Sequence, residues 1–262
     1  MRANPMRRPS VQDLYADLHT RILTGQLRPG ALLSETRVAE EYGLSRTPIR
    51  QVFHRLADAG FLLVVPQVGT YVAPIELGAV RDAQFVRETL ECRAVKRAAR
   101  SHRSDKAALL AGPMADQAGA IARGDHFGFF LADEALHRAI MEIAGHPHVW
   151  SLIVAAKVQL DRLRYLSLEA PDWLGMMHRE HEALLAAILS GDPHGAETVM
   201  KAHLRSAFAA IDRIAAEHAN FFDTGESGPA GRRRGAPSAD RRDKDSGADL
   251  ALVGPQGHDQ PE

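Results

Sequence analysis

The order of short elements in residues 10–74 constrains the fold of this chain more than any other feature. Three amphipathic helical patterns follow one another, each closed by a glycine, and two short runs of strand-forming residues come after them. These runs are 61–65 and 71–73, and the loop between them contains Pro66 and Gly69. Helix, short helix, turn, helix and hairpin is the order of a winged helix-turn-helix, so we predict this DNA-binding fold for residues 10–74.

Serine and glycine mark the expected boundaries of these helices. Ser10 can cap a helix that runs to about Thr24, where Gly25 stops it. The same rule places the remaining helix starts and ends at Ser34, Gly43, Ser45 and Gly60.

The third helical pattern carries the chemistry expected of a DNA-reading helix. Its polar face is formed by Arg46, Thr47, Arg50 and Gln51, and no acidic residue lies between Ser45 and Leu56. Arginine can bond guanine bidentately, and threonine and glutamine can reach base edges or phosphates. The alternative is an ordinary solvated helix face, but such a face usually carries charges of both signs.

Residues 78–222 form an almost unbroken helical pattern. A breaker combined with a capping residue interrupts it five times and predicts six helices. Their expected ranges are 78–101, 104–123, 126–144, 147–166, 172–190 and 193–220. The fold class predicted for the chain is therefore mainly α, with an N-terminal winged helix-turn-helix and a C-terminal all-helical bundle.

The last segment, residues 223–262, differs in composition from both units. It is rich in Gly, Ser, Pro, Asp and Arg and has few large apolar residues, so we expect a disordered tail. Its arginine clusters, 232–234 and 241–242, are read as part of a solvated tail, with a nonspecific DNA-tethering arm as the alternative.

Charge and cysteine content limit the classes of function. The formal net charge is −1, so DNA binding must come from a local patch. Cys92 is the single cysteine, which excludes a disulfide framework within the chain and a cysteine-based zinc site, and suits a reducing cytoplasm. No run of 18 apolar residues is present, so we expect a cytoplasmic protein that does not contact membranes.

Four polar residues lie on the apolar stripes of three predicted helices. Asp133 and His137 are one turn apart, and His181 and His203 each occupy the middle of an apolar face. Buried carboxylate and imidazole groups without partners are costly, and one shared divalent metal would satisfy all four. The alternative is that each histidine is a hydrogen-bonded core residue, and His178 is a rival ligand.

Arg87 also falls on an inward stripe, in register with Ala83, Leu90 and Ala94. A buried guanidinium needs an anion. Either an internal carboxylate or the carboxylate of a bound ligand would meet this need.

The segment LSETRVAEEYGLSRTPIRQVFHRLADAGFLLVVPQVGTYV, with ILTGQLRPGALLSE before and overlapping it, resembles the DNA-binding domain of the GntR family of bacterial regulators. The resemblance covers residues 10–74. It implies that DNA is contacted by Arg37, Ser45, Arg46, Thr47, Arg50 and Gly69, with Arg37 on phosphate and with Arg46 and Arg50 on bases.

Four further segments, VRETLECRAVKRAA, DEALHRAIMEIAGHPHVW, HREHEALLAAILSGD and AHL, resemble the FCD ligand-binding domain of the FadR-like subfamily over about residues 78–215. The resemblance implies a divalent metal, with zinc expected first and nickel or manganese as alternatives. It assigns as ligands Asp133, His137, His181 and His203. Effectors in this subfamily are often small carboxylic acids that meet an arginine such as Arg87.

These features together predict a transcription regulator, and we expect a repressor. It would be a homodimer that binds a pseudo-palindromic operator and releases or holds it according to a small organic acid. A metal-dependent hydrolase or lyase is the alternative from another class, but no general base lies beside the four residues on the inward stripes, so we expect no enzyme. A sensor whose effector is the metal itself remains open.

Overall fold

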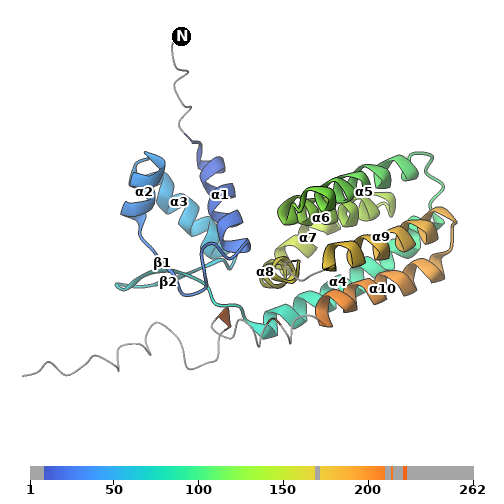
Figure 1. The fold of residues 1–262 in the computed structure, drawn as a ribbon. Coiled ribbons are helices and arrows are strands. Elements are labelled where there is room, and N and C mark those ends of the chain that lie inside the picture. The colour runs from blue at the N-terminus through green and yellow to red at the C-terminus, as the bar shows by residue number, and fades with distance from the viewer. Residues whose placement is uncertain (1–8, 169–171, 210–213, 215–220, 223–262) are drawn as a thin grey trace, which may run out of the picture.

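The computed structural model describes residues 9–168, 172–209, 214 and 221–222 of the chain. The expected disordered tail, 223–262, and the end of the helix predicted over 193–220 fall largely outside this part. Figure 1 shows two units joined in sequence, a smaller N-terminal unit with α1–α3 and the strands, and a larger helical unit with α4–α10. No helix in the described ranges is long and apolar enough to cross a membrane.

The N-terminal unit follows the element order predicted from its sequence. Its helices are α1 (Val11–Leu23), α2 (Glu35–Tyr42) and α3 (Arg46–Asp58). Ser10 and Asp13 form a reciprocal capping box at the start of α1, in which Ser10 Oγ accepts from the Asp13 amide at 3.1 Å. Ser45 stands at the N-cap of α3 as expected, but its hydroxyl makes no capping hydrogen bond.

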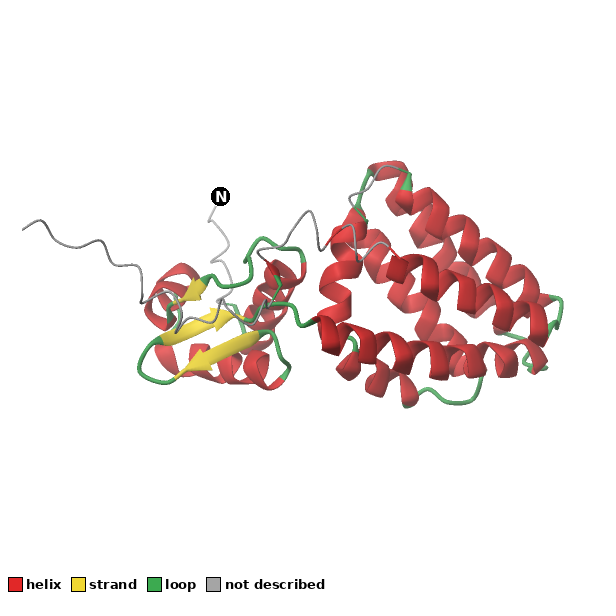
Figure 2. Cartoon of the chain, turned by 90° about the horizontal axis from the view of Figure 1, so that it is seen from below, coloured by secondary structure: helices red, strands yellow, loops and turns green. Residues whose placement is uncertain are grey.

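Three antiparallel strands form a small sheet beside these helices (Figure 2). They are β1 (Leu32–Leu33), β2 (Leu62–Val65) and β3 (Gly69–Val72), with β3 in the middle. Leu62 is opposite Val72 and Val65 is opposite Gly69, so the hairpin is tighter than the loop 66–70 expected from the sequence. The sequence analysis missed β1, because two residues are too short to show an alternating pattern.

The helical unit contains α4 (Leu77–Arg100), α5 (Lys106–Arg123), α6 (His126–Ile143), α7 (Val149–Ala156), α8 (Val158–Ser167), α9 (Trp173–Leu189) and α10 (Pro193–Ala209). α10 packs along α4 and α9, and α5 packs against α6 and α9. Its main core is aliphatic, with Val95, Leu136, Leu184 and Met200 almost fully buried. This packing places the inward stripes of α6, α9 and α10 toward one another.

The single helix expected over 147–166 is instead two helices, α7 and α8. Lys157, with φ −93° and ψ 11°, separates them. The apolar pattern continues across the break, so the break could not be predicted from that pattern. The side chain of Lys157 is buried and pairs with Glu134 at 2.6 Å and with Asp161, and this burial of an ammonium group accompanies the local departure from helix.

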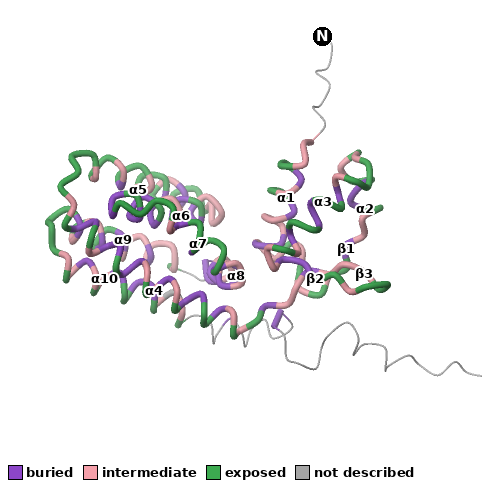
Figure 3. Tube along the Cα trace, turned by 180° about the vertical axis from the view of Figure 1, so that it is seen from behind, coloured by how far each residue is buried: buried purple, intermediate pink, exposed green. Residues whose placement is uncertain are grey.

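Residues 221–222, the last that the structure describes, contact the segment that connects the two units. The amide of Ile75 donates to the carbonyl of Phe221 at 2.8 Å, and Ile75 pairs with Phe222 in a parallel bridge. All three side chains are buried in one cluster with Leu160 and Leu163 of α8. In Figure 3, α8 lies between the helical unit and the N-terminal unit.

Candidate metal centre and DNA-binding face

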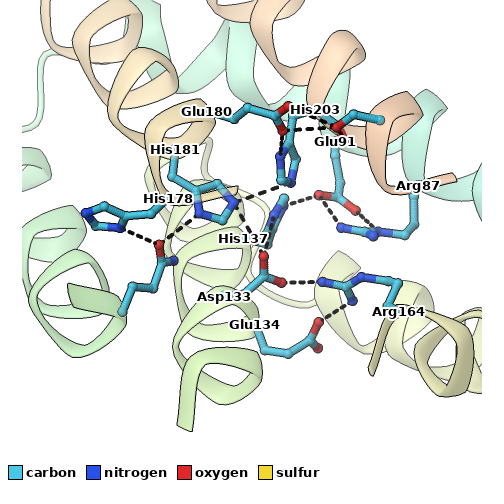
Figure 4. A network of polar contacts seen from close by, with 12 residues as sticks. Arg87, Glu91, Asp133, Glu134, His137, Arg164, His178, Glu180, His181 and His203 are labelled. Carbon is cyan, nitrogen blue, oxygen red and sulfur yellow. Dashed lines mark hydrogen bonds and ion pairs between the residues drawn. The ribbon is translucent and has the colours of Figure 1, made fainter. Parts of the chain in front are cut away.

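Asp133, His137, His181 and His203 meet in the interior of the helical unit (Figure 4). Asp133 and His137 project from neighbouring turns of α6, His181 comes from α9 and His203 from α10. Each offers one ligand atom, and these atoms all lie within 4.8 Å of one another. None of the four side chains is more than slightly exposed. The residues singled out by helical spacing alone therefore lie together, which is the arrangement a shared ion requires.

Each imidazole turns its Nδ1 atom outward, toward an oxygen acceptor. His181 Nδ1 lies 2.9 Å from Gln117 Oε1, His203 Nδ1 lies 2.8 Å from Glu180 Oε2, and His137 Nδ1 contacts Glu91 Oε2. Carboxylate and amide oxygens accept hydrogen bonds, so each Nδ1 is assigned the proton of a neutral ring. The Nε2 atoms then carry lone pairs, as they do in metal-binding histidines oriented by outer partners.

The inward Nε2 atoms are left without suitable donors. His181 Nε2 and His203 Nε2 are 3.3 Å apart, and His137 Nε2 is buried with no hydrogen-bond partner among the described residues. Lone pairs this close repel one another, and a buried nitrogen without a partner is costly. A cation among the three nitrogens would remove both penalties, so the donor set fits a metal.

Asp133 completes the set with an oxygen. Its Oδ1 lies 3.4 Å from His181 Nε2, while Oδ2 contacts the guanidinium of Arg164. Burial favours the protonated acid, but the positive charge of Arg164 outweighs it and holds the pKa of Asp133 below its usual range. Burial lowers the pKa of His181 and of His203. The site therefore presents a carboxylate from Asp133 and neutral imidazoles from His181 and His203, the protonation states that bind metals.

Arg164 is a residue of this site that the sequence analysis did not single out. It projects from α8 and pairs with Asp133, with Glu134 at 2.8 Å and with Asp161 at 2.8 Å. Burial lowers the pKa of Arg164, but the three carboxylates outweigh this effect and raise it above its ordinary value. Its position follows a helix break that the sequence did not reveal, so the apolar pattern of 147–166 gave no signal for it.

Arg87 has an internal partner. Its Nε donates to Glu91 Oε1 at 2.6 Å, both side chains are almost fully buried, and the other oxygen of Glu91 contacts His137. Burial opposes ionisation of Glu91, but Arg87 and His137 lower its pKa. Of the two partners considered from the sequence, the structure contains the internal carboxylate, and Arg87 acts on the four-residue site through Glu91 and His137.

A cavity of about 20 Å³ adjoins Asp133, His203 and Arg164. The rest of its lining is mostly apolar and comprises Phe129, Phe130, Ser167, Leu168, Trp173 and Met177. Arg87 does not belong to this lining. The volume is enough for about one water molecule, so in this conformation the cavity has no room for an organic ligand.

His178, considered as a rival ligand, lies beside this site. Its Nδ1 is 3.1 Å from Gln117 Oε1, the same oxygen that faces His181. It is not among the four residues whose ligand atoms converge. Its contact with Gln117 makes it a neighbour of an outer partner.

The residues expected to contact DNA lie on the surface of the N-terminal unit. Exposed side chains of this group come from α2 and from the start of α3, and they are Arg37, Ser45, Arg46, Thr47 and Arg50. Gly69, the residue expected at the wing tip, begins β3 with φ +154°, where a Cβ would lie 2.8 Å from Leu32 Cδ1. Only glycine fits this close approach without displacing Leu32.

Glu35 joins the two arginines expected to read bases. At the first turn of α2, it accepts from Arg46 Nη2 at 2.9 Å and from Arg50 Nε at 2.9 Å. Burial opposes ionisation, but the two guanidinium groups lower the pKa of Glu35. The sequence analysis did not single it out, although its place one residue after the helix cap was readable.

A small unit with an exposed basic helix and a wing, followed by a helical unit with an enclosed polar site, defines a DNA-binding transcription regulator with an effector-binding domain. Family comparison agrees with this class. Residues 10–72 match the model of the bacterial regulatory proteins of the gntR family, and residues 82–206 match the FCD domain. The chain belongs to the GntR family of transcription regulators.

Similar proteins cover nearly the whole described length. An HTH-type transcriptional regulator in an unstable DNA locus of Streptomyces ambofaciens is 36% identical over 83% of this chain and 91% of its own. The HTH-type transcriptional repressor RspR of Escherichia coli K12 is 31% identical over 84% of this chain and 96% of its own. The E. coli McbR/YncC structure has a TM-score of 0.66 and 23% identity over 78% of this chain and 97% of its own, which shows the shared fold.

Proposed function

We propose that this regulator is a repressor whose operator affinity is set by a small carboxylic acid bound beside a metal ion in the helical unit. The observation that carries the proposal is the convergence of three outward-anchored imidazoles on a space where their Nε2 atoms have no donor. The repressor role rests on similarity, since RspR and a probable D-xylose utilization regulator of Paenarthrobacter nicotinovorans are both named repressors.

The ligands proposed for the metal are Asp133, His137, His181 and His203. Three imidazole nitrogens and one carboxylate oxygen suit a borderline divalent ion, so zinc is proposed first, with nickel or manganese as alternatives. The bound metal would supply a Lewis-acidic position for an oxygen of the effector. Glu91, Gln117 and Glu180 would keep the rings in the tautomer that binds metal.

The effector proposed for the cavity is a small acid with an apolar body. Aromatic and aliphatic side chains form most of the lining, which favours a hydrophobic group, while Arg164 supplies a guanidinium that can grip a carboxylate. Arg164 takes the role first expected of Arg87, because Arg164 lines the cavity and Arg87 does not.

Operator recognition is proposed to use the exposed residues of α2, α3 and the wing. Arg37 would contact phosphate, and Arg46 and Arg50 would read bases, with Glu35 fixing the direction of both guanidinium groups. Two copies of the unit over residues 10–74 in a homodimer, formed through the unit over 78–222, would read the two halves of a pseudo-palindrome.

The experiment that tests this proposal is operator binding by the full-length protein on DNA from upstream of its own gene. The metal content is measured in parallel, and a panel of small carboxylic acids is added with zinc present. Release of the operator by one acid, with about one metal per chain, is the expected result. Tight binding that no acid alters, in a protein without metal, would contradict it.

A dedicated metal sensor uses the same four residues and makes a different prediction. Zinc alone would then lower or raise the affinity for the operator, and added acids would cause no further change. The zinc-only arm of the experiment separates the two, since the proposed acid sensor requires a further change when the acid is added.

A further inference from the structure

Helix α8 presents two opposite faces to two different parts of the molecule. Successive residues of an α-helix are about 100° apart, so Asp161 and Arg164 share one face, and Gln159 and Arg162 lie on the other. Leu160 and Leu163 form a third, buried side that anchors the helix in a cluster with Ile75 and Phe222. A change in the contacts of one face can therefore move this short helix and alter the contacts of the opposite face.

The first face holds the candidate metal centre. Arg164 contacts Asp133 Oδ2 and pairs with Glu134 at 2.8 Å, both of α6. Asp161 accepts from Arg164 at 2.8 Å and contacts Lys157 at the break before α8. Asp133, a proposed ligand of the metal, and helix α8 are therefore parts of one buried ionic network.

The opposite face holds the N-terminal unit by its backbone. Gln159 Nε2 donates to the carbonyl of Gly60 at 2.8 Å, and Arg162 Nη1 donates to the carbonyl of Ala73 at 2.8 Å. Gly60 follows the DNA-reading helix α3, and Ala73 follows the last strand of the wing. These two bonds consequently fix both ends of the hairpin relative to the helical unit.

The contact of Arg162 is poised to open. The residue is 2% exposed, and among the described residues its guanidinium donates to the carbonyl of Ala73 and to Gln159 Oε1 at 3.0 Å, with no carboxylate. A buried charge without a counter-ion is costly, and separation of the two units would return it to water. The burial of this charge therefore opposes the closed arrangement, which the other contacts between the two units favour.

A second contact joins the N-terminal unit to the wall of the cavity. Leu23, the last residue of α1, is buried in one cluster with Phe129, Phe130, Leu168 and Met177. Those four residues line the cavity beside Arg164. Widening the cavity to admit a ligand would thus disturb the packing of α1 as well as the ionic network of α8.

We propose that α8 transmits occupancy of the cavity to the DNA-binding unit, with Arg164 as the receiving residue and Gln159 and Arg162 as the residues that release or hold the hairpin. This inference rests on the proposed function. A carboxylate that engages Arg164 competes with Asp133 and Glu134 for the guanidinium and moves α8. The bonds to Gly60 and Ala73 on the other face then change, and with them the placement of α3 and the wing.

Two variants of the full-length protein test this proposal. Gln159→Leu and Arg162→Met each remove the donor to the N-terminal unit and keep much of the side-chain volume. Arg97→Met is the matched control, because Arg97 Nε also donates to a backbone carbonyl, that of Ala144 at 3.2 Å, but within the helical unit. Operator affinity, zinc affinity and amide hydrogen exchange over residues 60–73 are measured for each protein without ligand, with zinc, and with zinc and acetate.

When acetate is added in the presence of zinc, the operator affinity of the wild type is expected to change at least about fivefold, a typical coupling between two sites. The rate of amide hydrogen exchange over residues 60–73 should change with it. Both interface variants should bind zinc as the wild type does, yet lose the change in operator affinity and in exchange. Arg97→Met should keep both. Gln159→Leu removes only a half-buried amide, so it serves where Arg162→Met does not fold.

Full coupling in a folded Gln159→Leu or Arg162→Met protein would overturn the role of α8 and leave the sensor function standing. Failure of the wild type to change its operator affinity with any acid of the panel, acetate included, in the presence of zinc would have a different meaning. It would remove the metal- and acid-sensing function itself, and the transmission through α8 with it.

Discussion

Glu35 decides where two arginines of the DNA-reading helix point. Because one carboxylate accepts from Arg46 and Arg50, their guanidinium groups are held before DNA arrives, which lowers the entropy lost on binding. Glu35→Gln should weaken discrimination between operator and unrelated DNA by about tenfold, the scale of one base-reading pair. Nonspecific affinity should rise, because a negative charge near the phosphates is removed.

The measurement is a pair of titrations, on operator and on random duplex, at several salt concentrations. Glu40→Gln removes the same charge from an exposed position of the same helix and serves as the control. If both variants keep the discrimination of the wild type, Glu35 does not position the two arginines.

His19 ties stability to pH at the boundary between the units. Burial lowers the pKa of His19, with Asp161 raising it and Lys157 lowering it, and the ring packs edge-on against Phe61 at 4.6 Å. Above pH of about 6.5 the ring is neutral in both the folded and the unfolded chain. Below it the unfolded chain binds the proton more readily, so the free energy of unfolding falls as the pH falls.

His19→Gln should therefore be less sensitive to acid than the wild type. Urea unfolding of the metal-free protein at about pH 7.5 and pH 5.5 measures this, because the linkage appears as a difference in unfolding free energy between the two pH values. An identical pH dependence in the wild type and the variant would show that His19 contributes nothing to it.

Residue spacing predicted the four candidate metal ligands but not the residues that form hydrogen bonds and ion pairs with them. Asp133, His137, His181 and His203 fall on apolar stripes, so their common direction was readable from the helical period. Glu91 shares the buried side of α4 with Arg87, one turn away, and that pairing was readable in principle. Arg164 was not, since its direction depends on the break at Lys157.

At the scale of elements, glycine has opposite roles at two helix positions. Gly43 ends α2 with φ +62°, whereas Gly78 lies in the first turn of α4, and a Cβ at either position would meet no atom within 4 Å. Backbone conformation is therefore the main difference between the two. Gly43→Ala should lower the free energy of unfolding by about 1 kcal/mol, and Gly78→Ala should raise it by about 0.5 kcal/mol.

Thermal and urea unfolding of the two variants check this pair. A loss of stability in Gly78→Ala would show that its surroundings are less open than the structure has them. A gain in Gly43→Ala would show that the turn between α2 and α3 does not need the left-handed conformation.

Element boundaries were predictable where a local signal marks them and not where tertiary contacts decide. Ser10, Ser34 and Gly43 stand at the ends of helices as the sequence predicts. β1 depends on pairing with Tyr71 and Thr70, residues far along the chain, and the α7–α8 break accompanies ion pairs with Glu134 and Asp161. A single sequence pattern contains neither kind of information.

At the scale of the whole molecule, the sequence predicts both units but not how they touch. The contacts of Gln159 with Gly60 and of Arg162 with Ala73 join residues nearly 100 positions apart. They involve backbone carbonyls, which every residue has, so no residue type marks them in advance. The arrangement that links sensing to DNA binding is therefore a property of the folded chain.

Zinc-edge X-ray absorption by the zinc-loaded, full-length protein tests the central claim, a four-residue metal site open to an acid, most directly. The account predicts tightly held zinc with three imidazole nitrogens and one carboxylate oxygen from the protein. It also predicts a changed coordination shell on addition of a carboxylic acid, and loss of tight binding in His137→Ala. Zinc that dialyses away, or a coordination shell without imidazole, would contradict the account. The four residues would then be hydrogen-bonded core residues and not metal ligands.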